Sequence, residues 1–150
     1  MSADCKIVMV EPQPTAVVRI TAPMTELMEA QKTSRAKLEE ALPTLDCGTS
    51  GYGCTLWRPP VKGKLYMEPG FIVTRTFKPA GDVAPSEMPG GKVAHYIMQG
   101  PHDGLPAAWK MLLDWVKMRN LRPAGTNWEV YGDDHPDPAK LKTRLYALLK

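Results

Sequence analysis

The chain has 150 residues, which is enough for one domain with its own hydrophobic core. Its formal net charge is only +3, and 19 basic residues are interspersed with 16 acidic ones, so a nucleic-acid-binding protein with a concentrated basic face is not expected. No apolar run is long enough to span a bilayer, and the N-terminus lacks the apolar core of a signal peptide, so we expect a cytoplasmic protein with no membrane partner.

The three cysteines are Cys5, Cys47 and Cys54, an odd number with no C-x-x-C spacing and no histidine placed to complete a zinc site. Reduced thiols fit this pattern, so we expect neither a metal site nor a cofactor. A nucleophilic Cys54 would need a base such as His95 beside it, and nothing in the sequence brings the two together.

The first half of the chain is predicted to form several strands and one helix. Apolar and small residues recur at three- and four-residue steps from Leu27 to Leu38, which predicts an amphipathic helix that ends at Pro43. Runs of β-branched residues predict the strands, and Pro69-Gly70 is interpreted as a turn. In chain order we expect a short apolar run at 7–10, a strand at 16–20, the helix at 24–42, a strand at 53–58, a short strand extension at 65–67 and a strand at 71–77.

Residues 79–91 contain three prolines and three glycines in thirteen positions, so we expect no regular element there and interpret them as the link between two halves. In the second half, an apolar stripe from Leu105 to Val116 predicts a helix that runs from about 103 to about 119. Trp109 falls on this stripe and is expected in the core, whereas Trp115 is expected to be half exposed. Strands are expected at 92–98, 128–131 and 143–149.

The order strand–helix–strand–strand thus occurs twice, and the 76 positions between Val17 and Val93 indicate an internal duplication. We expect an α+β fold, in which duplicated βαββ modules form one curved antiparallel sheet with two helices packed on one face. The single domain, 1–150, would comprise module one at about 5–78, a linker at about 79–91 and module two at about 92–150. The opposite face would be partly open, and Glu129 would look out from it.

The stretch Trp128-Glu129-Val130-Tyr131 places a carboxylate between aromatic residues. Because successive side chains of a strand point to opposite faces, Glu129 and Tyr131 share one face of the sheet. A carboxylate that leaves water needs a compensating partner, so this pair on a concave surface indicates a receptor for a cationic or proton-accepting group. The ordinary alternative is an edge strand whose Glu129 is solvated.

Other aromatic residues are candidates for the same cleft. Trp57 lies on the equivalent strand of the first half and is either an opposing aromatic wall or core against the helices. Tyr96 and His95 point to opposite faces of their strand, and Tyr96 is the better cleft candidate, with His95 as a core or edge histidine. Tyr131 is either a cleft residue or an ordinary aromatic on the sheet surface.

The ordered motifs resemble those of one known family. They are Val93-Ala94-His95-Tyr96, Gly100-Pro101-His102-Asp103-Gly104-Leu105, Trp109, Trp115 and Trp128-Glu129-Val130-Tyr131. They are similar to the GyrI-like small-molecule-binding family, which includes the bacterial gyrase-inhibitory protein and the effector-binding regions of multidrug-responsive and AraC-type transcription regulators. The similarity covers nearly the whole chain and is firmest from 91 to 149.

The resemblance implies a ligand cleft between the two modules. Glu129 matches the family's cleft glutamate, which meets the positive or polar part of amphipathic, often aromatic ligands, and Tyr131 matches the family's tyrosine. At the start of the second helix this chain has His102 where the family usually has tyrosine, so a phenol is replaced by an imidazole that titrates near neutrality. About 15 residues precede Ala16 and contain no helix-turn-helix, so we expect a stand-alone member.

Three functions follow from these expectations. The first is a binding protein for amphipathic, cationic or aromatic small molecules, with Glu129, Tyr131, Trp57, Tyr96 and His102 as ligand-binding residues. The second is a cofactor-free hydrolase of strained, cyclopropane-bearing natural products, in which Glu129 positions water. The third is a protein that inhibits gyrase. We expect a small-molecule ligand and no direct contact with nucleic acid, and a homodimer remains open.

Overall fold

The computed structural model describes residues 4–48, 51–132 and 136–150. Within these residues the strands form one nine-stranded sheet in the order β1-β7-β9-β8-β4-β5-β2-β6, and β3 also pairs with β5. All of the pairings between these strands are antiparallel. The strands are β1 Lys6–Val10, β2 Gln13–Val18, β3 Ile20–Ala22, β4 Gly53–Val61, β5 Lys64–Ile72, β6 Val83–Met88, β7 Gly91–Gln99, β8 Pro123–Tyr131 and β9 Lys142–Leu149.

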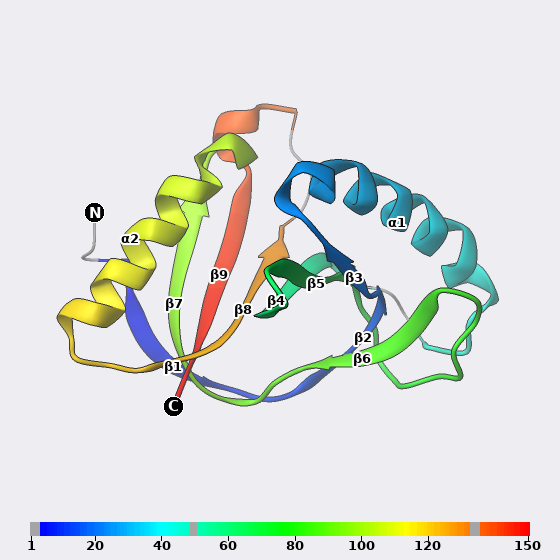
Figure 1. The fold of residues 1–150 in the computed structure, drawn as a ribbon, viewed down its shortest axis with the longest axis horizontal. Coiled ribbons are helices and arrows are strands. Elements are labelled where there is room, and N and C mark those ends of the chain that lie inside the picture. The colour runs from blue at the N-terminus through cyan, green and yellow to red at the C-terminus, as the bar shows by residue number, and fades with distance from the viewer. Residues whose placement is uncertain (1–3, 49–50, 133–135) are drawn as a thin grey trace.

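Two α-helices lie on one face of this sheet. They are α1 Leu27–Ala41 and α2 Leu105–Met118, and the short 3-10 helices are η2 Met24–Glu26, η3 Leu42–Thr44, η4 His102–Gly104 and η5 Pro138–Lys140. Figure 1 shows α2 and α1 well apart, with the strands at the middle of the sheet between them. The predicted α+β fold, with one curved antiparallel sheet and two helices on one face, is confirmed.

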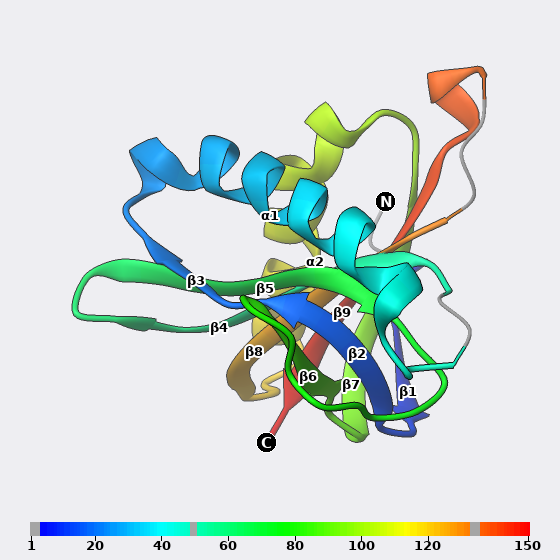
Figure 2. The same ribbon diagram turned by 90° about the vertical axis from the view of Figure 1, so that its right-hand side faces the viewer.

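Each helix buries its apolar face against different strands. The buried stripe of α2, which includes Ala108, Leu112 and Val116, packs on residues of β7 and β9. The buried Leu38 of α1 packs on residues of β2, β3 and β5, and Figure 2 shows α1 lying across these strands. Because the two helices cover opposite ends of the sheet, the central pair β4 and β8 lies in the space between them.

A third core lies on the other face of the sheet and shows how strongly the sheet is rolled. Val8 of β1 and Met88 of β6 belong to the two ends of the strand order, yet both pack in one cluster with Trp128 of the central strand β8. The sheet is therefore bent into a half-barrel that encloses this cluster. The alternation along β8 places Trp128 and Val130 in the cluster and leaves Glu129 on the face that carries the helices.

Two expectations about the strands are wrong. Residues 79–91, expected to hold no regular element, contain β6, whose Pro85 is tolerated because β6 is the last strand of the order and has one free side. The Pro69-Gly70 pair is not a turn but lies inside β5, and the chain leaves the strand at Ile72 rather than continuing to Phe77.

The neighbouring strand explains why β5 can contain Pro69. The strand beside it is interrupted at Arg19, since β2 ends at Val18 and β3 begins at Ile20, so the missing N–H of the proline costs little there. Gly70 is needed for close packing: a Cβ there would lie 2.0 Å from the carbonyl oxygen of Ala16.

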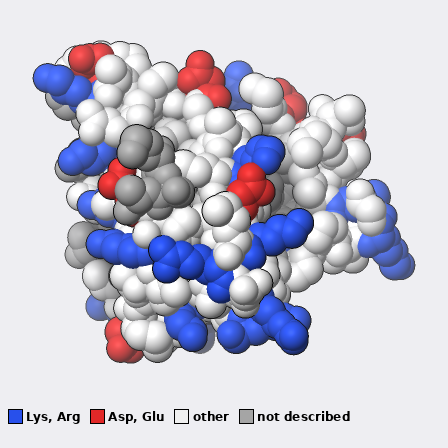
Figure 3. All heavy atoms as spheres, turned by 90° about the vertical axis from the view of Figure 1, so that its left-hand side faces the viewer, with Lys and Arg blue, Asp and Glu red and all other residues white. Residues whose placement is uncertain are grey.

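The surface on the side of the N-terminus carries a band of Lys and Arg side chains, as Figure 3 shows. This gathering arises in space, because basic residues are interspersed along the chain. No helix among the described residues is long and apolar enough to cross a membrane.

Candidate functional site

Glu129 lies on the helix-covered face of β8 and is 5% exposed. Its Oε1 accepts a hydrogen bond from the indole Nε1–H of Trp109 at 2.6 Å, and its Oε2 accepts one from the hydroxyl of Tyr131 at 2.8 Å. Trp109 belongs to α2, so the prediction that Glu129 looks out from the face opposite the helices is wrong. The alternation along β8 was predicted correctly, but it does not say which face the helices cover.

A chain of hydrogen bonds continues from Tyr131 to the first helix. The hydroxyl oxygens of Tyr131 and Thr55 are 2.7 Å apart, and Nη2 of Arg35 donates to Oγ1 of Thr55 at 3.1 Å. The Tyr131 proton goes to Glu129, so Thr55 donates to Tyr131. The chain therefore runs in one direction, from the guanidinium of Arg35 through two hydroxyl groups to the carboxylate of Glu129.

Arg35 is held firmly in this position. Its Nη1 donates to the carbonyl oxygen of Gly70 and its Nη2 to that of Cys54, each at 2.9 Å. Its Cζ lies 5.5 Å from the ring centre of Tyr131 and 5.6 Å from that of Phe71, within range of cation–π attraction. The sequence around Arg35 contains no local signal that marks it as a partner of Thr55.

Burial, and next the nearby charge of Glu129, raise the pKa of Tyr131 well above its ordinary value. The phenol therefore stays protonated near neutrality and remains a hydrogen-bond donor to Glu129. Burial likewise raises the pKa of the Cys54 thiol to about 12, so Cys54 is protonated and unsuited to act as a nucleophile.

A cavity of about 300 Å³ opens beside Glu129. Its lining comes from the start of α2 and from the central strands, and consists of Trp57, Leu105, Pro106, Trp109, Leu113, Asn127 and Glu129. Trp57 of β4 and Asn127 of β8 are directly paired, so they form one floor of the cavity. The cavity is thus a mainly apolar space with two indole rings and a single carboxylate, a composition typical of small-molecule sites.

The structure brings most of the predicted site residues together. Trp57 and Glu129 line the cavity, and Tyr131 bonds to Glu129. The ring of His102, on the exposed η4, lies 5.3 Å from the ring of Tyr131. Tyr96 is elsewhere, because it packs against the α2 core from β7.

The environments of Trp109, Trp115 and His95 were also predicted from the sequence. Trp109 packs against the α2 core as expected, and it also lines the cavity and donates to Glu129. Trp115, expected to be half exposed, is buried. His95 is buried as expected for a core histidine: its Nδ1 is 2.9 Å from the carbonyl oxygen of Leu145 and its ring stacks on Tyr146.

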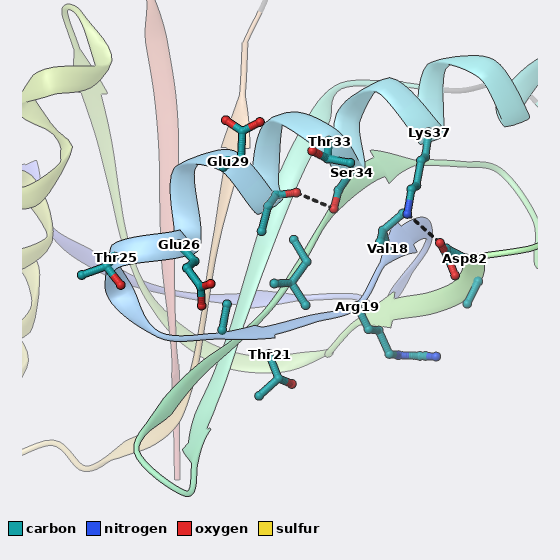
Figure 4. Close-up of a pocket in the computed structure, with 14 residues that line it drawn as sticks. Val18, Arg19, Thr21, Thr25, Glu26, Glu29, Thr33, Ser34, Lys37 and Asp82 are labelled. Atoms are coloured by element: carbon teal, nitrogen blue, oxygen red, sulfur yellow. Dashed lines mark hydrogen bonds and ion pairs between the residues drawn. The ribbon is translucent and has the colours of Figure 1, made fainter.

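A larger hollow of about 790 Å³ lies between α1 and the strands β2 and β3. Figure 4 shows Lys37 reaching across to Asp82, at 2.6 Å, and Ser34 turned back onto the carbonyl oxygen of Ala30. Lys37 and Asp82 thus pair with each other, and the charged side chains of this hollow are exposed to water, which screens their attraction for a ligand. No residue predicted for the site lines it.

Metal ligands are not grouped in the described part of the chain. Among residues 4–48, 51–132 and 136–150, no three His, Cys, Asp or Glu side chains gather so that they could hold a metal ion.

Comparison with solved structures shows the same fold in proteins of low sequence identity. EcmrR in its complex with DNA is 19% identical, with a TM-score of 0.81. The alignment covers 97% of this chain and 57% of EcmrR, so this chain spans little more than half of the length of EcmrR. The separate C-terminal domain of EcmrR is 20% identical with a TM-score of 0.77, and the alignment covers 97% and 96% of the two chains. SAV2435, determined bound to tetraphenylphosphonium, is 13% identical with a TM-score of 0.71, and the alignment covers 97% and 93%.

No curated protein matches the sequence. A family model does match it, over residues 3–150, and describes the GyrI-like small molecule binding domain. Since this match spans nearly the entire chain, the protein belongs to the GyrI-like small-molecule-binding family.

Proposed function

We propose that the protein binds a small amphipathic cation with an aromatic group in the cavity beside Glu129. The observation that carries this proposal is a buried carboxylate without a cationic partner. Among the described residues, no Lys, Arg or His forms an ion pair with Glu129. Burying a charge without a compensating one is costly, so a site of this kind favours a ligand that brings the positive charge itself.

The other fully buried glutamate makes the contrast clear. Glu68 is 1% exposed, and its Oε2 lies 2.8 Å from Nε of Arg58 and 3.5 Å from Nε of Arg19. Its Oε1 also accepts a hydrogen bond from Ser86. Glu68 is therefore neutralised within the fold, whereas Arg35 reaches Glu129 only through Thr55 and Tyr131.

Glu129 also has room for a ligand contact. A carboxylate offers about four acceptor directions, and the indole of Trp109 and the hydroxyl of Tyr131 use two of them. These two donors fix the orientation of the carboxylate, so a ligand meets an anion that is already in place. Fewer rotamers then have to be immobilised on binding, which favours affinity.

The apolar part of the ligand would contact the rings of Trp57 and Trp109, both of which line the cavity. Indole faces attract cations as well as aromatic rings, so they suit an aromatic cation. The volume of about 300 Å³ is at the lower end for ligand pockets, which favours a compact molecule such as a bicyclic amine. SAV2435, which shares the fold, binds tetraphenylphosphonium, a cation with aromatic rings.

The test is calorimetric titration with two probes that share one ring system. Naphthylmethyl(dimethyl)ammonium carries the positive charge, and naphthylmethanol is neutral. We expect Glu129→Gln to weaken binding of the cation about tenfold or more, a loss of about 1.4 kcal/mol, with little change for the alcohol. Glu26→Gln, which removes a carboxylate from the larger hollow, is the matched control and should leave both affinities unchanged. Equal binding of the cation to wild type and Glu129→Gln would overturn the proposal.

Hydrolysis of a strained, cyclopropane-bearing electrophile at the same carboxylate stays a separate prediction. It is tested by incubating the protein with such a compound and searching by mass spectrometry for the product of water addition. A product that forms with wild type and is lost with Glu129→Gln would make the site catalytic. Binding without product would indicate that Glu129 binds the positive charge of a ligand and does not catalyse hydrolysis.

A further inference from the structure

The short strand β3 has one free edge. Its residues, Ile20–Ala22, pair with β5 on one side. On the other side, β6 pairs with the preceding strand β2 as far as Val83, opposite Val18, and does not continue beside β3. Among the described residues, no backbone group outside β5 bonds to this strand. Because the N–H and C=O groups of a strand point alternately to its two sides, β3 presents backbone groups that a further strand can bind.

A tight turn before β6 explains why this strand does not extend along β3. The backbone N–H of Ala80 donates to the carbonyl oxygen of Val83 at 2.9 Å, and the N–H of Val83 donates to that of Ala80 at 3.0 Å. Within the turn Gly81 has a φ of 59°, a conformation that favours glycine. The chain therefore reverses direction just where β3 begins to lack a neighbour.

The larger hollow, of about 790 Å³, lies along this free edge. All three residues of β3 line it, together with residues of η2 and α1. Figure 4 shows it beneath α1, with Glu26 toward one end and the Lys37–Asp82 pair at the other. Neighbouring strands lie about 4.8 Å apart, so a strand paired with the free edge of β3 would run through this hollow.

We propose that the larger hollow binds an extended segment of a partner polypeptide, which adds to β3 as one more strand. The charged side chains of the hollow are exposed and screened by water, so charge alone attracts a small molecule only weakly. An extended peptide instead gains main-chain hydrogen bonds from the strand edge, as in other cases of β-strand addition. The hollow shares no lining residue with the cavity beside Glu129, so this inference is independent of the proposed function.

The surroundings of β3 define the chemistry of this segment. The side chains of Ile20 and Ala22 are buried in the core beneath α1, whereas Thr21 is exposed. Every second side chain of the added strand would face the same core and should be apolar, and the others should be polar. An antiparallel strand would begin beside Ala22, near Glu26, which forms no ion pair among the described residues. A basic residue is therefore favoured at the start of the segment.

The test is amide hydrogen exchange, followed by NMR, with the acetylated and amidated peptide Arg-Val-Thr-Val-Thr-Val as the probe. At saturating peptide, at least one amide of Ile20–Ala22 should exchange about tenfold more slowly or less. The strand β1 ends the strand order and also has one free side, so its amides are the internal control and should be unaffected. Slower exchange at both edges, or at neither, would overturn the proposal.

Methyl groups on the peptide nitrogens separate strand addition from other modes of binding. One probe is methylated at the nitrogens of its first two valines, and the other at the nitrogens of its two threonines. Because alternate residues of a strand direct their N–H groups to the same neighbour, one probe should lose about tenfold or more in affinity and the other should bind nearly as before. Equal affinities of the two methylated peptides would overturn pairing with β3.

Glu26→Gln tests the position of the basic residue. It should weaken binding of the peptide about threefold, as expected for one exposed ion pair, with no change for a peptide that begins with glutamine. Glu40→Gln, on an exposed part of α1 outside the hollow, is the matched control and should have no effect. Equal losses in both variants, or none in either, would overturn the antiparallel placement. Naphthylmethyl(dimethyl)ammonium should bind equally with and without the peptide, so each proposal can fail without the other.

Discussion

The indole Nε1 of Trp109 lies 2.6 Å from Oε1 of Glu129, so the helix that walls the cavity is tied to the carboxylate at its floor. On the other side, Thr55 and Tyr131 connect the same carboxylate to Arg35 of α1. The two helices pack on different ends of the sheet, and this chain of hydrogen bonds joins them across the central strands. The site is therefore part of what holds the helices in place.

Trp109→Phe tests the first contact. Removing the indole N–H leaves one oxygen of Glu129 without its donor, so we expect the free energy of unfolding to fall by about 1–3 kcal/mol and the affinity for an aromatic cation to fall as well. Urea denaturation and calorimetry measure the two effects. Trp115→Phe makes the same change in a buried residue of α2 outside the cavity, and it should lower stability without altering affinity. Loss of affinity in both variants would contradict a specific role for Trp109.

Tyr131→Phe removes the hydroxyl group that accepts from Thr55 and donates to Glu129. Because both partners then lose a hydrogen bond in a buried place, the free energy of unfolding should fall by about 1–3 kcal/mol. Tyr146→Phe, on the opposite face of the sheet, should cost less than about 1 kcal/mol. Urea denaturation of both variants measures the difference. Equal losses of stability would contradict a larger contribution of the Tyr131 hydroxyl to the folded state.

Arg35→Met tests the guanidinium at the start of the chain of hydrogen bonds that leads to Glu129. It removes the donors to Thr55 and to the carbonyl oxygens of Cys54 and Gly70, so the free energy of unfolding should fall by about 3 kcal/mol. Arg35→Lys keeps the charge but loses the planar fork, and its loss should be intermediate. Lys32→Met, on the exposed side of α1, should change stability by less than about 0.5 kcal/mol. A loss in Arg35→Met no larger than in Lys32→Met would contradict the proposed network.

The pKa of His95 is lowered first by burial and then by the charges of Lys6 and Arg144, although the hydrogen bond to the Leu145 carbonyl opposes this. The unfolded chain therefore binds a proton more readily than the folded one. The stability that neutral His95 contributes is complete above the ordinary pKa of 6.5 and is lost as the pH falls below it. Urea midpoints measured from about pH 8 to about pH 5 should decline less in His95→Gln than in wild type. Parallel declines would assign the pH dependence to other groups.

The sequence alone determined the type and order of most elements. The spacing of apolar residues from Leu27 to Leu38 and from Leu105 to Val116 predicted both helices, because a helix that packs on a sheet needs an apolar stripe at that period. The same local logic identified Glu129 as an unusual carboxylate between aromatic residues. The division into two modules with a linker at 79–91 stays a prediction.

Only the tertiary structure decided which face of β8 the helices cover and what meets Glu129 there. Arg35 and Thr55 carry no mark of their role in the sequence, since their partners lie on other strands and helices. For the same reason, the sequence did not predict that β5 continues through Pro69. The proline is tolerated because the neighbouring strand is interrupted between β2 and β3, which are distant from Pro69 in the sequence. Alternation and periodicity are properties of a short segment, whereas the choice of face and of hydrogen-bond partners depends on how distant segments pack together.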